Sequence, residues 1–128
     1  MSKRGYHHGN LRQALVEATL ELIAEKGPAG FTMAEAAKRA DVSAAAPYRH
    51  FTGREDLIAE VAHQGYELFA DLLNFAWADG QPSVLRAFEA VGRAYLAFAR
   101  QHPGHYIAMF ESGVAPNQTP GLAAAADR

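Results

Sequence analysis

The 128-residue sequence contains no cysteine, so it can form neither a disulfide framework nor a thiolate metal site. This absence fits a reducing compartment, and we therefore expect a cytoplasmic protein. Residues 1–8 lack the apolar run of a secretory signal peptide. No stretch approaches the roughly 18 uninterrupted apolar residues of a membrane span, and no segment alternates as a β-strand would. These absences favour an all-α protein with no membrane partner.

Catalytic motifs are missing as well. The sequence has no nucleophile elbow, no phosphate-binding loop and no metal-ligand pair, so we expect no enzyme, no catalytic residue and no cofactor. His63, His102 and His105 could be considered as metal ligands, but Pro103 interrupts a regular helical face between the last two. Because no cysteine or acidic cluster lies nearby, we expect no metal site.

Two short helices and a tight corner are encoded between Thr32 and Arg54. Residues 32–35, Thr-Met-Ala-Glu, fit a capping box, in which a Thr hydroxyl and a Glu three residues later satisfy each other's backbone donors. The pattern predicts a helix from Thr32 to about Ala40. After a turn at residues 41–42, Ser43 is expected to cap a second helix.

This second predicted helix spans residues 44–51, and a second capping box at residues 52–55 is expected to begin a third helix. Ala37 is small where the two helix backbones must approach, and Val42 can fill the corner from inside. Two helices joined across so short a corner form a helix-turn-helix, whose second helix can lie in the major groove of DNA.

Hydrophobic residues recur at helical spacing in the rest of the chain, separated by clear breaks. The third predicted helix would be about 37 Å long, enough to leave one domain and enter the next. The predicted elements are a first helix from Asn10 to Lys26, the long helix from Arg54 to Ala78, a break at residues 79–82, a helix from Val84 that stops at His102, a short helix from His105 to about Gly113, and loop or ragged helix from Val114.

Charge is unevenly distributed along the chain. Residues 1–54 hold eight Lys or Arg against five Asp or Glu, whereas residues 55–128 hold four against nine. A basic front and an acidic back indicate that only the front meets phosphate, although ordinary solvated charge is the alternative. We expect one positive face made by Arg4, Arg12, Arg49 and Arg54.

Four features stand together within residues 10–58: Gly27, Thr32, Ala40-Asp41-Val42-Ser43 and Tyr48-Arg49-His50-Phe51. With these features, residues 10–58 resemble the N-terminal domain of the tetracycline-repressor-like (TetR) transcriptional regulators. The family usually has Gly at the corner position of Asp41, where a left-handed backbone is needed and Asp is better tolerated than most residues.

The resemblance implies a helix-turn-helix DNA-binding domain at residues 1–54. A long helix would join it to a partial, helical effector-binding and dimerisation domain at residues 55–128. The segment from Tyr95 to Phe110 is similar to part of that second domain. The chain is short for the family, whose members generally carry two more long helices that pair across a dimer. The protein is therefore either truncated or dimerises differently.

The resemblance also implies DNA contacts. Thr32, Tyr48, His50 and Arg54 match positions that touch phosphates, for which their side chains are suitable donors. Tyr48 could instead be a half-buried core aromatic, and His50 could lie beside the last carbonyls of its helix. We assign Phe51 to the core.

Base reading depends on fewer side chains. Ala34, Ala44 and Ala45 match base-reading positions, but their methyl groups can only pack on thymine methyls, so Arg49 is the one long donor on the recognition helix. A further pair, Lys3 and Arg4, either enters the minor groove as an arm or forms a disordered tail.

Aromatic residues of the second part could line an apolar effector cavity, as the resemblance implies, or could simply pack as a core. The candidates are Phe69, Trp77, Phe88, Tyr95, Tyr106, Met109 and Phe110. We therefore expect a homodimeric DNA-binding regulator, a repressor that a small apolar or aromatic effector releases from a double-stranded DNA operator. The alternative is a helical protein-interaction module that keeps the fold without sequence-specific DNA binding.

Overall fold

The computed structural model describes residues 10–113, and within that range every regular element is helical. The predicted all-α class is therefore confirmed. Lys3, Arg4 and the segment from Val114 lie outside the described residues. The elements are α1 (Leu11–Lys26), α2 (Met33–Arg39), the 3-10 helix η2 (Ala46–Arg49), α3 (Arg54–Trp77), the 3-10 helix η3 (Ala78–Gly80), α4 (Val84–Gln101) and α5 (Pro103–Phe110).

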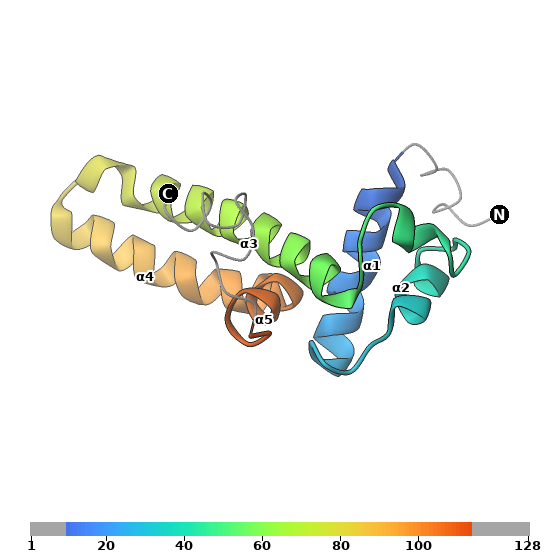
Figure 1. The fold of residues 1–128 in the computed structure, drawn as a ribbon. Coiled ribbons are helices and arrows are strands. Elements are labelled where there is room, and N and C mark those ends of the chain that lie inside the picture. The colour runs from blue at the N-terminus through green and yellow to red at the C-terminus, as the bar shows by residue number, and fades with distance from the viewer. Residues whose placement is uncertain (1–9, 114–128) are drawn as a thin grey trace.

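The long helix α3 connects two groups of elements (Figure 1). At its N-terminal end lie α1, α2 and η2, while its C-terminal part forms an antiparallel hairpin with α4. Between these groups, α5 packs against both α3 and α1. The buried core draws on all five α-helices and on both sides of residue 54.

The first two helices follow the sequence closely. Gly27 ends α1 with a positive φ of 82°, a conformation that suits glycine. At the start of α2, the backbone N–H of Glu35 donates to the Thr32 hydroxyl at 3.1 Å, and the Thr32 N–H donates to the Glu35 carboxylate at 3.1 Å. The capping box predicted at residues 32–35 is confirmed.

The second helix of the motif differs from the prediction. Instead of an α-helix over residues 44–51 capped by Ser43, there is one 3-10 turn whose N-cap is Ala45, without a side-chain cap. Pro47 explains the difference, because it has no N–H to donate to the carbonyl of Ser43. The neighbouring N–H groups bond three residues back instead, as from Ala46 to Ser43 at 3.1 Å.

The capping box predicted at residues 52–55 is wrong. The N-cap of α3 is Gly53, and no side chain caps it. The carboxylate of Asp56 accepts a hydrogen bond from the backbone N–H of Thr52 at 3.0 Å, so the acidic partner lies one residue later than expected.

The later breaks fall near their predicted positions. Helix α3 ends at Trp77, and Ala78 and Asp79 take left-handed backbone angles in the predicted break. Ser83 then caps α4 by accepting the N–H of Arg86 at 3.2 Å. Helix α5 begins at Pro103, two residues earlier than predicted, because proline is well suited to a first helical turn.

Candidate nucleic-acid interface

The corner between α2 and η2 is closed by backbone hydrogen bonds. Asp41 has a φ of 63°, so it adopts the left-handed conformation expected at this position. Its N–H donates to the carbonyl of Lys38 at 3.1 Å, and the N–H of Val42 donates to Ala37 at 3.0 Å. Val42 is partly buried and packs on the core, as predicted. The corner therefore fixes η2 relative to α2.

One edge of η2 is exposed and the other is buried. Ala44, Ala45, Tyr48, Arg49 and His50 are all exposed, and we call them the η2 edge. On the opposite side, the side chains of Ala46, Pro47 and Phe51 are buried, which confirms the core assignment of Phe51.

The exposed fraction of Tyr48 is 58%, and Tyr48 is not among the residues of the buried core. His50 is exposed and is also the C-cap of η2, so both interpretations of this residue fit its position. Thr32 is exposed, but its hydroxyl already accepts a hydrogen bond in the capping box.

Arg54 points inward. Its Nε donates to the backbone carbonyl of Phe31 at 3.0 Å, and its guanidinium carbon lies 4.8 Å from the centroid of the Phe31 ring. Nη2 is buried and has no hydrogen-bond partner among the described residues. Phe31 thus holds the guanidinium through both its backbone carbonyl and its ring. Sequence reasoning did not reveal this contact, since nothing in the sequence relates positions 23 residues apart.

Arg12 is also engaged within the molecule. Its guanidinium forms a 3.0 Å ion pair with Glu60 of α3 and lies 5.0 Å from the centroid of the Phe51 ring. The hydrogen bond with Glu60 raises the pKa of Arg12. Gln13 and Gln64 add a reciprocal pair of hydrogen bonds between α1 and α3, at 3.3 and 3.0 Å. The N-terminal turns of α1 are thereby fixed to α3.

Other cations near the motif are paired as well. Lys26 binds Glu35, and Arg39 binds Glu25, so the end of α1 is linked to α2 by two ion pairs. The hydrogen bond from Arg39 lowers the pKa of Glu25, and that from Lys26 lowers the pKa of Glu35.

By contrast, Arg49 is exposed and forms no ion pair within residues 10–113. The arginines expected on one positive face therefore have different environments, and Arg4 lies outside the described residues.

The seven candidate effector-binding residues do not share one environment. Phe69 packs edge-to-face against Tyr95 and Phe110, at centroid distances of 5.5 and 6.1 Å, and Tyr106 lies 5.0 Å from Phe110. Met109 is buried in the core.

Trp77 and Phe88 are on the outside, with exposed fractions of 39% and 70%. None of the seven candidates lines any of three cavities formed by the described residues.

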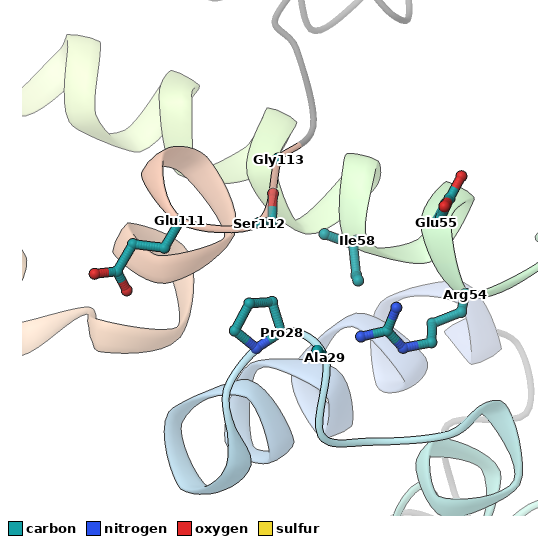
Figure 2. A pocket seen from close by; sticks show the side chains of 8 residues that line it. All are labelled: Pro28, Ala29, Arg54, Glu55, Ile58, Glu111, Ser112 and Gly113. Carbon is teal, nitrogen blue, oxygen red and sulfur yellow. The ribbon is translucent and has the colours of Figure 1, made fainter.

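One of these cavities lies where α3 meets the ends of α1 and α5, and sequence reasoning missed it. Its volume is about 230 Å³ (Figure 2). The residues that line it are Pro28, Ala29, Arg54, Glu55, Ile58, Glu111, Ser112 and Gly113. They come from three segments distant in the sequence, so no local pattern could have revealed them.

Residues 10–113 contain neither a membrane-spanning helix nor a cluster of possible metal ligands. Their helices include none with the length and apolar character needed to cross a membrane. Their histidine, aspartate and glutamate side chains form no group of three or more that could hold a metal ion.

Two segments of the sequence match models of known protein families. Residues 15–61 match the model for bacterial regulatory proteins of the tetR family, and residues 88–128 match a tetracyclin repressor-like C-terminal domain. The chain belongs to the tetR family. The first match contains the corner and η2, and the second begins within α4. No curated protein gives a significant match.

Solved structures share this fold of the TetR family. A protein of unknown function from Rhodococcus sp. RHA1 is 29% identical, with a TM-score of 0.77 over 95% of this chain and 63% of its own. A candidate tetR family transcription regulator from Shewanella sp. PV-4 is 23% identical, with a TM-score of 0.67 and coverages of 92% and 61%.

A third structure, of a candidate transcriptional regulator from Pseudomonas aeruginosa PAO1, is 21% identical. Its TM-score is 0.63, and the match covers 91% of this chain and 56% of the other. The chain spans less than two thirds of the length of each of these three proteins.

Proposed function

We propose that this protein is a cytoplasmic, non-enzymatic transcriptional regulator that binds double-stranded DNA through the η2 edge. The observation that carries the proposal is the exposure of Tyr48, Arg49 and His50 beside a corner closed by Asp41, within the segment that matches the tetR family. A fixed corner presents these side chains on a rigid frame, as major-groove recognition requires.

The proposed contacts divide into two roles. Tyr48, His50 and Thr32 bind phosphates, which positions the protein without reading sequence. Arg49 reads a base edge, and the methyl groups of Ala44 and Ala45 pack on thymine methyls. An N-terminal arm with Lys3 and Arg4 enters the minor groove. Arg54 is held against Phe31 in the free protein, so a phosphate contact requires its side chain to turn outward.

We further propose a repressor that works as a homodimer and is released from its operator by a small apolar or aromatic molecule. An exposed apolar stripe on α4 supports the dimer, because surplus apolar area of this kind is typical of an interface. Val84, Leu85, Phe88 and Leu96 have exposed fractions between 61% and 70%, and Phe75 of α3 reaches 87%. The aromatic cluster of Phe69, Tyr95, Tyr106 and Phe110 supports the effector proposal, because aromatic side chains of this kind can contact an apolar or aromatic molecule.

The second candidate is a protein-interaction module. One observation favours it: Tyr48 and His50 are assigned to phosphates, so Arg49 is the one side chain of the η2 edge left to hydrogen-bond a base, and Ala44 and Ala45 offer methyl groups alone. Such an edge has few means to read bases.

A fluorescence-anisotropy titration with genomic DNA fragments at two salt concentrations separates the two candidates. A DNA-binding regulator should bind some fragments tightly and should lose affinity as salt rises, because phosphate contacts release counterions. Tyr48→Ala should weaken binding to all fragments. Arg86→Ala, which changes an exposed residue of α4 far from the motif, serves as the control. Absence of saturable binding at low salt would favour the protein-interaction module.

A further inference from the structure

The cavity at the junction of α1, α3 and α5 is lined by one cationic side chain, two acidic side chains at its rim and a short apolar wall. Pro28 and Ala29 come from the loop after α1, and Ile58 comes from the first turns of α3. Figure 2 shows the guanidinium of Arg54 turned towards Ala29 and Ile58. This cavity is distinct from the aromatic cluster of Phe69, Tyr95, Tyr106 and Phe110 between α3, α4 and α5.

Arg54 has hydrogen-bonding capacity that residues 10–113 leave unused. A guanidinium carries five N–H donors, and Phe31 accepts only the one on Nε. Nη2 is buried and unpartnered within the described part of the chain. A buried donor without an acceptor is unfavourable, so an acceptor brought beside Arg54 would stabilise the arrangement.

The acidic residues at the rim do not satisfy Arg54. Glu55 and Glu111 also line the cavity, but both are exposed, and Figure 2 shows their carboxylates directed away from the guanidinium. Neither forms an ion pair with Arg54 in the described structure. The hydroxyl of Ser112 donates to the carbonyl of Ala108. The cavity therefore presents the charge of Arg54 without an internal counter-ion.

We propose that this cavity binds a small organic monocarboxylate. Its carboxylate would pair with the guanidinium of Arg54, because the two planar groups match in geometry and charge. Its hydrocarbon part would lie against Pro28, Ala29 and Ile58. The ligand class follows from the guanidinium of Arg54, from the two rim carboxylates that are directed away from it, and from the apolar residues beside it.

Binding there would also compete with DNA, and this second step rests on the proposed function. Arg54 matches a phosphate-contacting position, yet here it is held against Phe31. A bound carboxylate strengthens the inward arrangement and withholds Arg54 from phosphate. Ligand and DNA therefore bind different arrangements of one side chain, which makes their affinities reciprocally coupled.

The first experiment measures ligand binding without DNA. The full chain is titrated by calorimetry with benzoate and with benzamide, a neutral molecule of similar shape. We expect saturable binding of benzoate with a Kd below about 10 mM and at least about tenfold weaker binding of benzamide. Equal affinities, or no saturation with benzoate, would overturn the proposal.

Variants locate the site. Ala29→Trp blocks the cavity from an exposed loop position and should weaken benzoate binding at least about tenfold. Ala24→Trp changes an exposed alanine of α1 outside this cavity and is the matched control, expected to bind like the wild type. Arg54→Gln should lose the preference for benzoate over benzamide. Unchanged benzoate binding in Ala29→Trp or Arg54→Gln would contradict the site.

The second experiment tests the competition. Saturating benzoate should weaken the DNA affinity of the wild type about tenfold and leave that of Ala29→Trp unchanged. If benzoate binds as expected but no DNA binds under any condition, the proposed function is wrong and the carboxylate site stands. If DNA binds but benzoate does not, the carboxylate site is wrong and the proposed function stands. If both bind without affecting each other, the competition is wrong.

Discussion

Gly104 of α5 and Leu20 of α1 meet backbone to backbone. A Cβ atom on Gly104 would lie 2.5 Å from the carbonyl oxygen of Leu20 and 3.1 Å from its Cα. Real Cβ atoms do not approach backbone so closely, so only glycine fits at this contact. Helix α5 is therefore seated directly on α1, the helix that precedes α2 and the corner.

Gly104→Ala should destabilise the fold, because a rigid backbone rather than a flexible side chain must move. We expect the free energy of unfolding in urea to fall by about 1–3 kcal/mol. Gly92→Ala is the control, since Gly92 is exposed within α4 and a Cβ there would meet nothing within 4 Å. That change should stabilise the helix by roughly 0.5–1 kcal/mol. Similar losses in both variants would argue against the backbone contact.

The role of Arg49 is tested by comparing specific and non-specific DNA. If Arg49 binds a guanine edge, Arg49→Ala should cost roughly 1–3 kcal/mol on the preferred site and little on scrambled duplex. If it contacts only phosphate, both affinities should fall together, and the slope of log affinity against log salt should drop by about one. The measurement is a pair of salt titrations on each duplex. Parallel losses would reject base reading by this residue.

Arg54→Ala provides the comparison for that experiment. If Arg54 binds phosphate in the complex, its loss should weaken binding to all DNA sequences alike and lower the salt slope by about one. If Arg54 stays against Phe31 in the complex, the salt slope should not change. This measurement separates the inward arrangement from the phosphate contact.

His105 should make stability depend on pH. Burial disfavours the charged imidazolium, and with the nearby His102 it lowers the pKa of His105 from 6.5 to about 4. Between these values the unfolded chain binds the proton and the folded protein does not. The free energy of unfolding should therefore decrease as pH falls from 6.5 to about 4.

The slope should be less than about 1.4 kcal/mol per pH unit, the limit for one proton, because His105 is only partly buried. Urea titrations between these pH values would measure it. His105→Gln should flatten the dependence over this range, and an unchanged slope in that variant would show that other groups cause it.

The apolar stripe of α4 should govern assembly. Phe88 is 70% exposed, and its replacement by glutamate would place a charge within any interface formed there. We expect light scattering to show a dimer for the wild type and a monomer for Phe88→Glu. The control, Arg93→Glu, changes an exposed position of the same helix outside the stripe. A wild-type monomer at micromolar concentration would contradict the dimer.

Local patterns were sufficient for most of the helix positions. The capping box at Thr32 and Glu35, the glycine stop at Gly27 and the break after Trp77 all depend on residues close in sequence. The prediction of an α-helix over residues 44–51 is wrong because Pro47 lacks the N–H that such a helix needs, although this effect is also local in sequence.

The sequence by itself determined the all-α class, the order of the helices and the corner at Asp41, because capping, periodicity and turn chemistry act over a few residues. Only the tertiary structure decided which arginine side chains contact other residues of the protein and which stay exposed. Arg54 lies against Phe31 and Arg12 pairs with Glu60, while Arg49 stays exposed. These partners are distant in sequence, and their contacts exist only after α3 packs against α1 and the loop that carries Phe31. The burial and pairing of each charge are therefore properties of the folded protein.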